Sequence, residues 1–166
     1  MGPAALRASR RISLFLGAFL LLTLTEFRFR QELGPLVNGL LTVRAGASLL
    51  ALIVPQAGVH ARGDWIESDQ ASIHVAQGCE GVDVMLMFAA ATLALPLSWR
   101  RRAVVGLFGV LAIYLLNLVR VAGLWLCLRY WPTAFEAMHV TVGQTVMIIL
   151  ALSLLLGAAR FNLKEA

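Results

Sequence analysis

Long apolar runs, with the charged residues confined to the short stretches between them, make up most of the chain. A helix of about 20 apolar residues spans the hydrocarbon core of a bilayer, and these runs approach or exceed that length. The pattern therefore predicts an all-α integral membrane protein, a bundle of about four transmembrane helices that forms one polytopic domain over residues 1–166. The candidate spans are 12–27, 82–97, 103–128 and 140–159.

A fifth apolar run, 33–54, is interrupted by Asn38, Arg44 and Ser48. It is either an outer interfacial helix, whose polar side chains reach water or headgroups, or a fifth membrane helix. Five crossings would place the basic residues of the two chain ends on opposite sides of the membrane. Four crossings keep both ends on the cytoplasmic side, which makes the interfacial helix the more economical interpretation.

Basic residues gather at the ends of the apolar runs and indicate an orientation. Such clusters stay cytoplasmic, so the segments 55–81 and 129–139 should be extracytoplasmic. Within 55–81, the stretches 58–66 and 72–75 are typical of short strands joined by polar turns, which predicts a small hairpin. The first cluster and run resemble an uncleaved signal anchor, since no small-residue cleavage site follows. The clusters are Arg7, Arg10 and Arg11; Arg100, Arg101 and Arg102; and Arg160 with Lys164.

The composition excludes an ordinary soluble domain. Hydrophobic residues make up 60% and charged residues 14% of the chain, whereas soluble domains are about half apolar and a quarter charged. The net charge of +5 is compatible with nucleic-acid binding, but the cations flank apolar runs and act there as topology signals. We therefore expect contact with membrane lipid, no nucleic acid, and a multi-pass protein of the cell inner membrane.

Cys79 is the first candidate for chemistry because of its surroundings. It lies in a polar turn between Gly78 and Gly81, directly before the run 82–97. Unpaired amide groups at a helix N-terminus favour an anion, so we expect them to lower the pKa of this thiol. The neighbouring Glu80 works against a thiolate. The plain alternative is a small hydrophobic residue in a helix cap.

Arg120 lies inside the run 103–128 rather than at its edge. It follows the cytoplasmic Arg102 by 18 positions, so about 27 Å of helix place it in the outer part of the bilayer. Cations within a membrane usually face the bundle interior or an aqueous cavity and mark functional sites. The alternative is snorkelling to the outer headgroups, with Asn117 as a polar packing residue.

His139 precedes the run 140–159 and belongs at the same outer interface. A lone interfacial histidine is usually structural, but Cys79, Arg120 and His139 come from the outer parts of three helices in one small bundle. A thiolate nucleophile, a histidine acid/base and a guanidinium that stabilises an oxyanion are together sufficient for acyl transfer. These three residues are therefore the predicted catalytic site.

Other combinations of residues are alternatives. Cys127 is expected to be a packing residue, although a disulfide between Cys79 and Cys127 would contradict the catalytic interpretation. A metal site is the least favoured possibility, and we expect no cofactor and no metal. Its donors would be His60, His74, Asp64 and Asp69.

Three blocks of the sequence resemble the exosortase/archaeosortase family, and in particular the short exosortases of the H type. Their order, spacing and placement at helix edges are similar to the Cys, Arg and His motifs of that family over most of the chain. Glu80 departs from the pattern, because a small or uncharged polar residue commonly follows the cysteine. The blocks are Gly78-Cys79-Glu80-Gly81-Val82-Asp83 leading into Phe88-Ala89-Ala90; Leu116-Asn117-Leu118-Val119-Arg120; and Phe135-Glu136-Ala137-Met138-His139 with Gln144 beyond.

The resemblance implies a membrane-embedded cysteine protease or transpeptidase. Members of the family cleave the C-terminal sorting signals of exported proteins, and each signal comprises a short motif, an apolar helix and a basic tail. The resemblance also implies that Cys79 is the nucleophile, Arg120 the essential arginine and His139 the histidine of the site. The expected partners are therefore exported substrates, met at the extracytoplasmic side.

A non-enzymatic membrane protein is the competing class. In an assembly or transport subunit, Arg120 and Asp83 would serve helix packing or an ion path. Such a subunit has no need of the thiol of Cys79. Thiol chemistry therefore separates the two classes.

Overall fold

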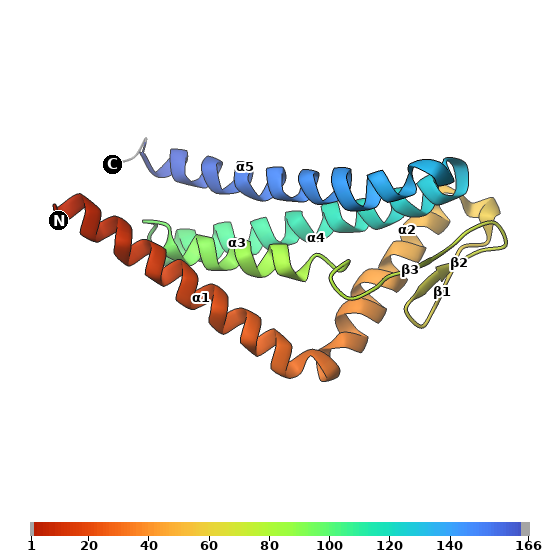
Figure 1. Cartoon of the computed structure of the whole chain (residues 1–166), viewed down its shortest axis with the longest axis horizontal. Coiled ribbons are helices and arrows are strands. Elements are labelled where there is room, and N and C mark those ends of the chain that lie inside the picture. Colours follow the sequence, from red (N-terminus) through yellow and green to blue (C-terminus); the bar gives the residue numbers. More distant parts are fainter. Residues whose placement is uncertain (1, 164–166) are drawn as a thin grey trace.

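The computed structural model describes residues 2–163, which are mostly helical (Figure 1). Five α-helices form the body of the molecule: α1 (Pro3–Gly34), α2 (Ala45–Ile53), α3 (Val82–Ala94), α4 (Trp99–Tyr130) and α5 (Gly143–Leu163). Two π-helices, η1 (Pro35–Arg44) and η4 (Ala137–Val142), and two 3-10 turns, η2 (Pro55–Ala57) and η3 (Pro132–Ala134), adjoin them. The strands β1 (His60–Arg62), β2 (Trp65–Glu67) and β3 (Ser72–His74) form a small sheet.

Three helical stretches within residues 2–163 are long and apolar enough to cross a membrane. α3 has 13 residues, which is about 20 Å of helix against a hydrocarbon core of about 30 Å. The expected span 82–97 ends as a helix at Ala94, because Pro96 lacks an amide proton and holds Leu95 in an extended conformation. The three long stretches are Ala5–Ile53, Trp99–Tyr130 and Ala137–Arg160.

α1, η1 and α2 form one continuous helical segment that bends where α1 meets η1 (Figure 1). Pro35 opens η1 directly after Gly34 and has no amide proton to donate to the preceding turn. The run 33–54, expected as an interfacial or membrane helix, is thus helical. It leaves α1 at an angle and passes across the end of the bundle rather than extending α1.

The two ends of the elongated molecule differ (Figure 1). The N-terminus, the C-terminal end of α5 and the connection between α3 and α4 lie at one end. We call it the basic end because Arg10 lies near the N-terminus, Arg100 in the first turn of α4 and Arg160 near the end of α5. The sheet, α2 and the connection between α4 and α5 lie at the other end, the sheet end. The arginines of the three basic clusters therefore gather on one side of the bundle, and Lys164 lies outside the described residues.

The sheet has the strand order β1-β2-β3 and is antiparallel throughout. Ile66 of β2 opposes Ile73 of β3, and both side chains are buried. They pack in one hydrophobic core with Val121 and Trp125 of α4. This segment thus has three strands rather than the two stretches that the sequence indicated, and its apolar face attaches the sheet to α4.

A second core joins α3, α4 and α5. It contains the buried side chains of Phe88, Ile113 and Met147, one from each helix. The ring of Phe88 lies so close to Gly109 of α4 that a methyl group there would overlap it. A residue without a side chain at this position therefore allows α3 and α4 to pack closely.

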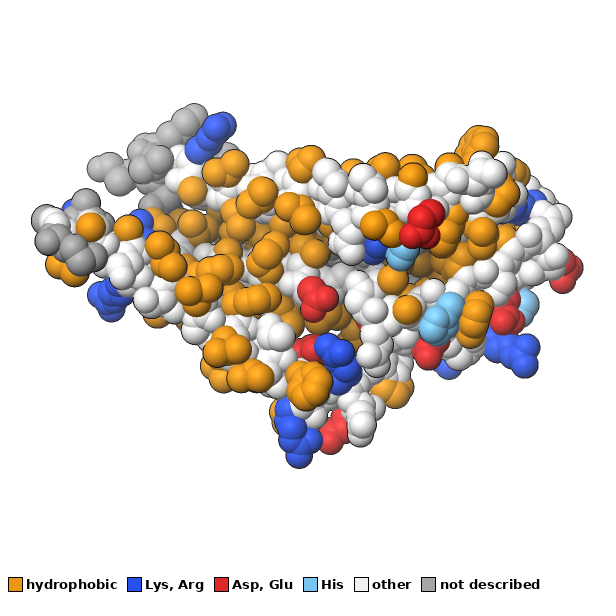
Figure 2. Space-filling view, viewed as in Figure 1, with side chains coloured by type: hydrophobic (Ala, Val, Ile, Leu, Met, Phe, Trp, Pro, Cys, Tyr) orange, Lys and Arg blue, Asp and Glu red, His pale blue; other side chains and the backbone are white. Residues whose placement is uncertain are grey.

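Apolar side chains cover much of the helical surface (Figure 2). Leu107 and Phe108 of α4 and Ile149 of α5 are 69%, 64% and 58% exposed. A continuous apolar surface of this extent is unfavourable in water and is normally covered by a partner or by lipid. Together with the three long apolar helices, this surface identifies a membrane protein.

Candidate active site

Cys79 lies in a tight turn between β3 and α3. Its amide donates a hydrogen bond of 3.0 Å to the carbonyl of Ala76. On either side of the cysteine, Gly78 and Gly81 have positive φ angles of 89° and 78°. Residues with a side chain rarely adopt this conformation, so the backbone of the turn requires both glycines.

Asn117 of α4 holds this turn from the other side. Its side-chain amide donates a 3.0 Å hydrogen bond to the carbonyl oxygen of Cys79, and the side chain is only 1% exposed. Gly81 packs directly on it, since a Cβ atom at position 81 would lie 2.9 Å from the Cγ of Asn117. α4 therefore fixes both the cysteine and the start of α3.

Arg120 lies one helical turn after Asn117 and connects α4 to the beginning of α5. Its Nη1 donates to the side-chain oxygen of Asn117 over 3.3 Å, and its Nη2 donates to the carbonyl of His139 over 3.5 Å. The guanidinium also lies against Gly143, where a Cβ atom would be 2.6 Å from Nε. The guanidinium therefore points to α5 within the bundle and is held there, unlike a cation that snorkels to the headgroups.

His139 belongs to the π-helix η4, which precedes α5. Its ring stacks on that of Phe135, with 5.8 Å between the centroids and 7° between the planes. The Nδ1 atom is buried and has no hydrogen-bond partner within the described residues. Since no partner fixes a proton on Nδ1, either ring nitrogen is free to carry it.

Cys79 and His139 line the same cavity, which has a volume of about 140 Å³. Segments from three parts of the chain form its walls: β3 with the residues that follow it, α4, and the connection between α4 and α5. The structure therefore brings Cys79 and His139 together, with Arg120 attached to the backbone of His139. The apolar part of the wall consists of Ile73, Val75, Ala76, Val121, Leu124 and Phe135.

The environment of Cys79 changes the expected electrostatics. Burial raises the pKa of its thiol, and the charge of Glu80 raises it further, whereas the charge and hydrogen bonding of Arg120 lower it. The expectation that a helix N-terminus lowers this pKa is therefore wrong. The N-cap of α3 is Gly81, so Cys79 precedes the helix and lies in a half-buried turn. A proton acceptor close to the thiol would therefore favour its deprotonation.

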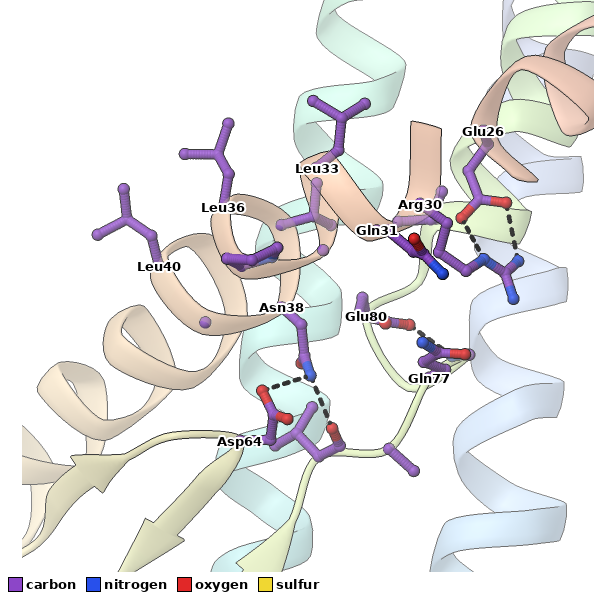
Figure 3. A pocket seen from close by; sticks show the side chains of 18 of the residues that line it. Glu26, Arg30, Gln31, Leu33, Leu36, Asn38, Leu40, Asp64, Gln77 and Glu80 are labelled. Carbon is purple, nitrogen blue, oxygen red and sulfur yellow. Dashed lines mark hydrogen bonds and ion pairs between the residues drawn. The ribbon is translucent and has the colours of Figure 1, made fainter. Parts of the chain in front are cut away.

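A larger groove of about 1280 Å³ adjoins the same turn (Figure 3). Gln77 and Glu80 line this groove, but Cys79 does not. Across the groove, Arg30 of α1 makes a bidentate pair with Glu26, with nitrogen–oxygen distances of 2.9 and 2.8 Å. The turn therefore separates two spaces, with the cysteine on the cavity side and the carboxylate of Glu80 on the groove side.

The remaining candidates do not form a second site. Cys127 is buried and its thiol is free, as is that of Cys79. The four residues considered as metal donors are not gathered: Asp64 accepts a hydrogen bond from Asn38, and His60 lies 3.9 Å from Glu67. Within residues 2–163, no group of three or more His, Cys, Asp or Glu side chains is arranged to hold a metal.

Sequence reasoning missed Asn117 and Gly143 as parts of the site. The spacing of Asn117 and Arg120 was a usable signal, because residues three apart lie on one face of a helix. Gly143 gave no such signal, since its contact with Arg120 depends on how α5 packs against α4. Asn117, treated as a packing residue, is the hydrogen-bonded link between Cys79 and Arg120.

A family model described as transmembrane exosortase matches residues 1–157 of the chain. The matched range includes the cysteine turn, α4 and the start of α5. No curated protein and no solved structure matches the chain.

Proposed function

Since the chain belongs to the exosortase family, we propose that it cleaves the C-terminal sorting signals of exported proteins as a cysteine transpeptidase or peptidase. Exosortases are membrane-embedded cysteine peptidases and transpeptidases with a role in protein sorting. The proposed nucleophile is Cys79, the proposed acid/base is His139 and the proposed electrostatic residue is Arg120.

One observation carries this proposal. Cys79 and His139, which lie far apart in the sequence, line one cavity of about 140 Å³, and Arg120 is bonded to the carbonyl of His139. A nucleophile and a base that line one cavity, next to a fixed guanidinium, are the components that acyl transfer requires. A scaffold protein has no need of this combination.

In the proposed reaction, the proton of the Cys79 thiol passes to His139 as the sulfur attacks the carbonyl carbon of the scissile peptide bond. A tetrahedral intermediate forms, and its oxygen carries the negative charge. The carbon–nitrogen bond then breaks, His139 returns the proton to the leaving amine, and the acyl group stays on Cys79 as a thioester. An incoming amine or another acceptor attacks the thioester and releases the thiol.

Arg120 serves this reaction through its position. The guanidinium is held by Asn117 and by the carbonyl of His139, so little reorganisation is needed when charge develops nearby. Preorganised donors of this kind stabilise an oxyanion in a site from which water is largely excluded. Alternatively, the N–H groups of the Arg120 guanidinium orient the substrate backbone by donating hydrogen bonds to it.

We also propose four crossings of the cell inner membrane, with the basic end in the cytoplasm and the sheet end outside. The basic clusters of the chain support this orientation. α3 and the extended residues after it form the shortest crossing, and the helical run 33–54 belongs to the outer side. The cavity with Cys79 then faces the compartment into which substrates are exported.

The variant Cys79→Ala tests the function. The substrate is an exported protein of the same organism that ends in a short motif, an apolar stretch and a basic tail. Processing should be abolished while membrane insertion is unchanged, because the acyl-enzyme cannot form. Cys127→Ala is the matched control and should process normally, since its thiol is buried away from the cavity. Normal processing by Cys79→Ala would reject the proposal and favour an assembly or transport subunit.

The orientation has its own test. A reporter fused after Ser68 should be extracytoplasmic, and a reporter inserted at Arg101 should be cytoplasmic. The reversed pair of results would place Cys79 on the side where no exported substrate is met, and the proposed function would be abandoned.

A further inference from the structure

β3 directs its backbone groups to two sides. In an antiparallel strand, the amide and carbonyl groups of alternate residues point to opposite edges. The amide of Val75 donates to the carbonyl of Asp64 over 2.9 Å, on the side of β2. In the register of β2 and β3, the amide and carbonyl groups of Ser72 and His74 therefore point away from β2.

This second edge of β3 is open. β3 is the last strand in the order β1-β2-β3. Within the described part of the chain, no backbone hydrogen bond joins Ser72 or His74 to a residue on the side away from β2. Both residues are exposed, as is Ala76. A strand edge with free amide and carbonyl groups is a template for a further strand.

The open edge leads to the cysteine. Residues Ile73 to Ala76 line the cavity that contains Cys79 and His139. β2 lies on one side of β3, and the connection between α4 and α5, which carries His139, lies on the other (Figure 1). The chain then turns at Ala76, whose carbonyl accepts the amide of Cys79. A strand laid along this edge would therefore reach the thiol at its end.

We infer that the substrate segment preceding the apolar helix binds in an extended conformation and adds to the open edge of β3 as a fourth strand. This inference rests on the proposed function and specifies how its substrate is held. Main-chain hydrogen bonds to Ser72 and His74 provide the attachment. An extended backbone also presents its peptide carbonyls in a regular row, so the register of the added strand decides which carbonyl lies at Cys79.

The rigidity of β3 suits it to this role. The carbonyl of Val75 accepts a 3.0 Å hydrogen bond from Asn38 of η1, which also bonds to Asp64 (Figure 3). On the outer face, the rings of Trp65 and His74 lie 4.8 Å apart. β3 is thus fixed by β2 and by η1. A substrate strand that pairs with the edge of β3 away from β2 would leave these hydrogen bonds unchanged.

Disulfide crosslinking tests the inference directly. Ser72→Cys or His74→Cys is introduced into a protein that carries Cys79→Ala and Cys127→Ala, so that the substrate binds without being cleaved. The probe is an exported protein of the same organism with a C-terminal signal, carrying single cysteines at successive positions before its apolar helix. Each edge cysteine should crosslink mainly to one substrate position. Moving the cysteine from His74 to Ser72 should shift that position by about two residues, because paired strands run in register.

The outcomes separate this inference from the proposed function. A crosslinked position that does not shift, an even spread of crosslinks, or no crosslink would overturn strand addition. Crosslinking does not depend on cleavage, so it remains informative if Cys79→Ala proves to be active. A shift of about two residues together with an active Cys79→Ala variant would keep the docking mode and reject the catalytic role.

A second comparison uses cleavage. His74→Pro removes the amide proton that points to the open edge, whereas His74→Ala removes the side chain and keeps that proton. Cleavage by His74→Pro should be lower than that by His74→Ala by up to about tenfold, the loss expected for one hydrogen bond. Equal alkylation of Cys79 by iodoacetamide in the two variants would verify an intact site. Equal cleavage by two such variants would overturn the inference.

Discussion

The side-chain amide of Asn117 donates a 3.0 Å hydrogen bond to the carbonyl oxygen of Cys79, and its side-chain oxygen accepts a 3.3 Å hydrogen bond from Arg120. A single buried residue thereby links the turn that carries the thiol to the guanidinium that acts on the thiol. Because Asn117 and Arg120 lie on one face of α4, any movement of that helix displaces both together. The relative position of thiol and guanidinium therefore depends on Asn117.

Asn117→Ala should slow the alkylation of Cys79 by iodoacetamide and raise the pH at which it occurs. Without its anchor, the Arg120 guanidinium loses part of its hold near the thiol, and its effect of lowering the pKa of Cys79 weakens. The measurement is the rate of alkylation against pH in a Cys127→Ala background. The free energy of unfolding should also fall by about 1–3 kcal/mol, because the carbonyl of Cys79 loses its donor.

Thr92→Ala is the control for Asn117→Ala. Thr92 is another buried polar residue, but its hydroxyl donates to the carbonyl of Phe88 within α3, away from the cavity. This variant should lose stability without any shift in the alkylation profile. The same behaviour in Asn117→Ala would show that Asn117 supports only the fold.

Gly143→Ala should impair processing. The new Cβ atom would lie 2.6 Å from Nε of Arg120, so the guanidinium must move from its place beside the carbonyl of His139. Gly157→Ala is the matched control in the same helix, because, among the described residues, nothing beyond the adjacent backbone of α5 lies within 4 Å of the Cβ position there. Comparison of the initial cleavage rates at matched protein levels checks the prediction. Equal rates for the two variants would contradict a fixed role for the guanidinium.

Arg120→Lys should lower turnover by about 100- to 1000-fold, the loss typical for one preorganised oxyanion donor. Lysine retains the positive charge and a long stem, but not the planar group that donates both to Asn117 and to the carbonyl of His139. Single-turnover cleavage of a sorting-signal substrate is the measurement. If Arg120 only anchored the helix at the headgroups, lysine would preserve nearly normal cleavage.

Glu80→Gln should shift the alkylation profile of Cys79 to lower pH. The charge of Glu80 raises the pKa of the thiol, so removing the charge lowers that pKa and increases the thiolate fraction at a given pH. Glutamine still has an oxygen to accept the amide of Gly78, which the carboxylate accepts now. Glu136→Gln removes the charge of an exposed residue that is not among the groups shifting the pKa of Cys79, so it should leave the profile in place.

The sequence by itself determined the class of the protein and its family. A bilayer requires a minimum length of apolar helix and keeps basic residues at one side, and these requirements act on contiguous residues that can be read along the chain. The family resemblance, drawn from the blocks around Cys79, Arg120 and His139, is confirmed by the match over residues 1–157. The helix within the predicted span 82–97 ends earlier than we expected, at Ala94, because Pro96 holds its immediate neighbour Leu95 in an extended conformation.

Only the tertiary structure decided which contacts join the Cys79, Arg120 and His139 motifs to one another. The bond from Asn117 to Cys79 joins residues 38 positions apart, and the contact of Gly143 with Arg120 joins two helices. The pKa of Cys79 is raised rather than lowered because burial, which is set by packing, outweighs the local turn. Likewise, Ile73 to Ala76 come to line the cavity with Cys79 only because the sheet packs on α4. Contacts between distant segments depend on the packed arrangement of all of them, so no local pattern in the sequence specifies them.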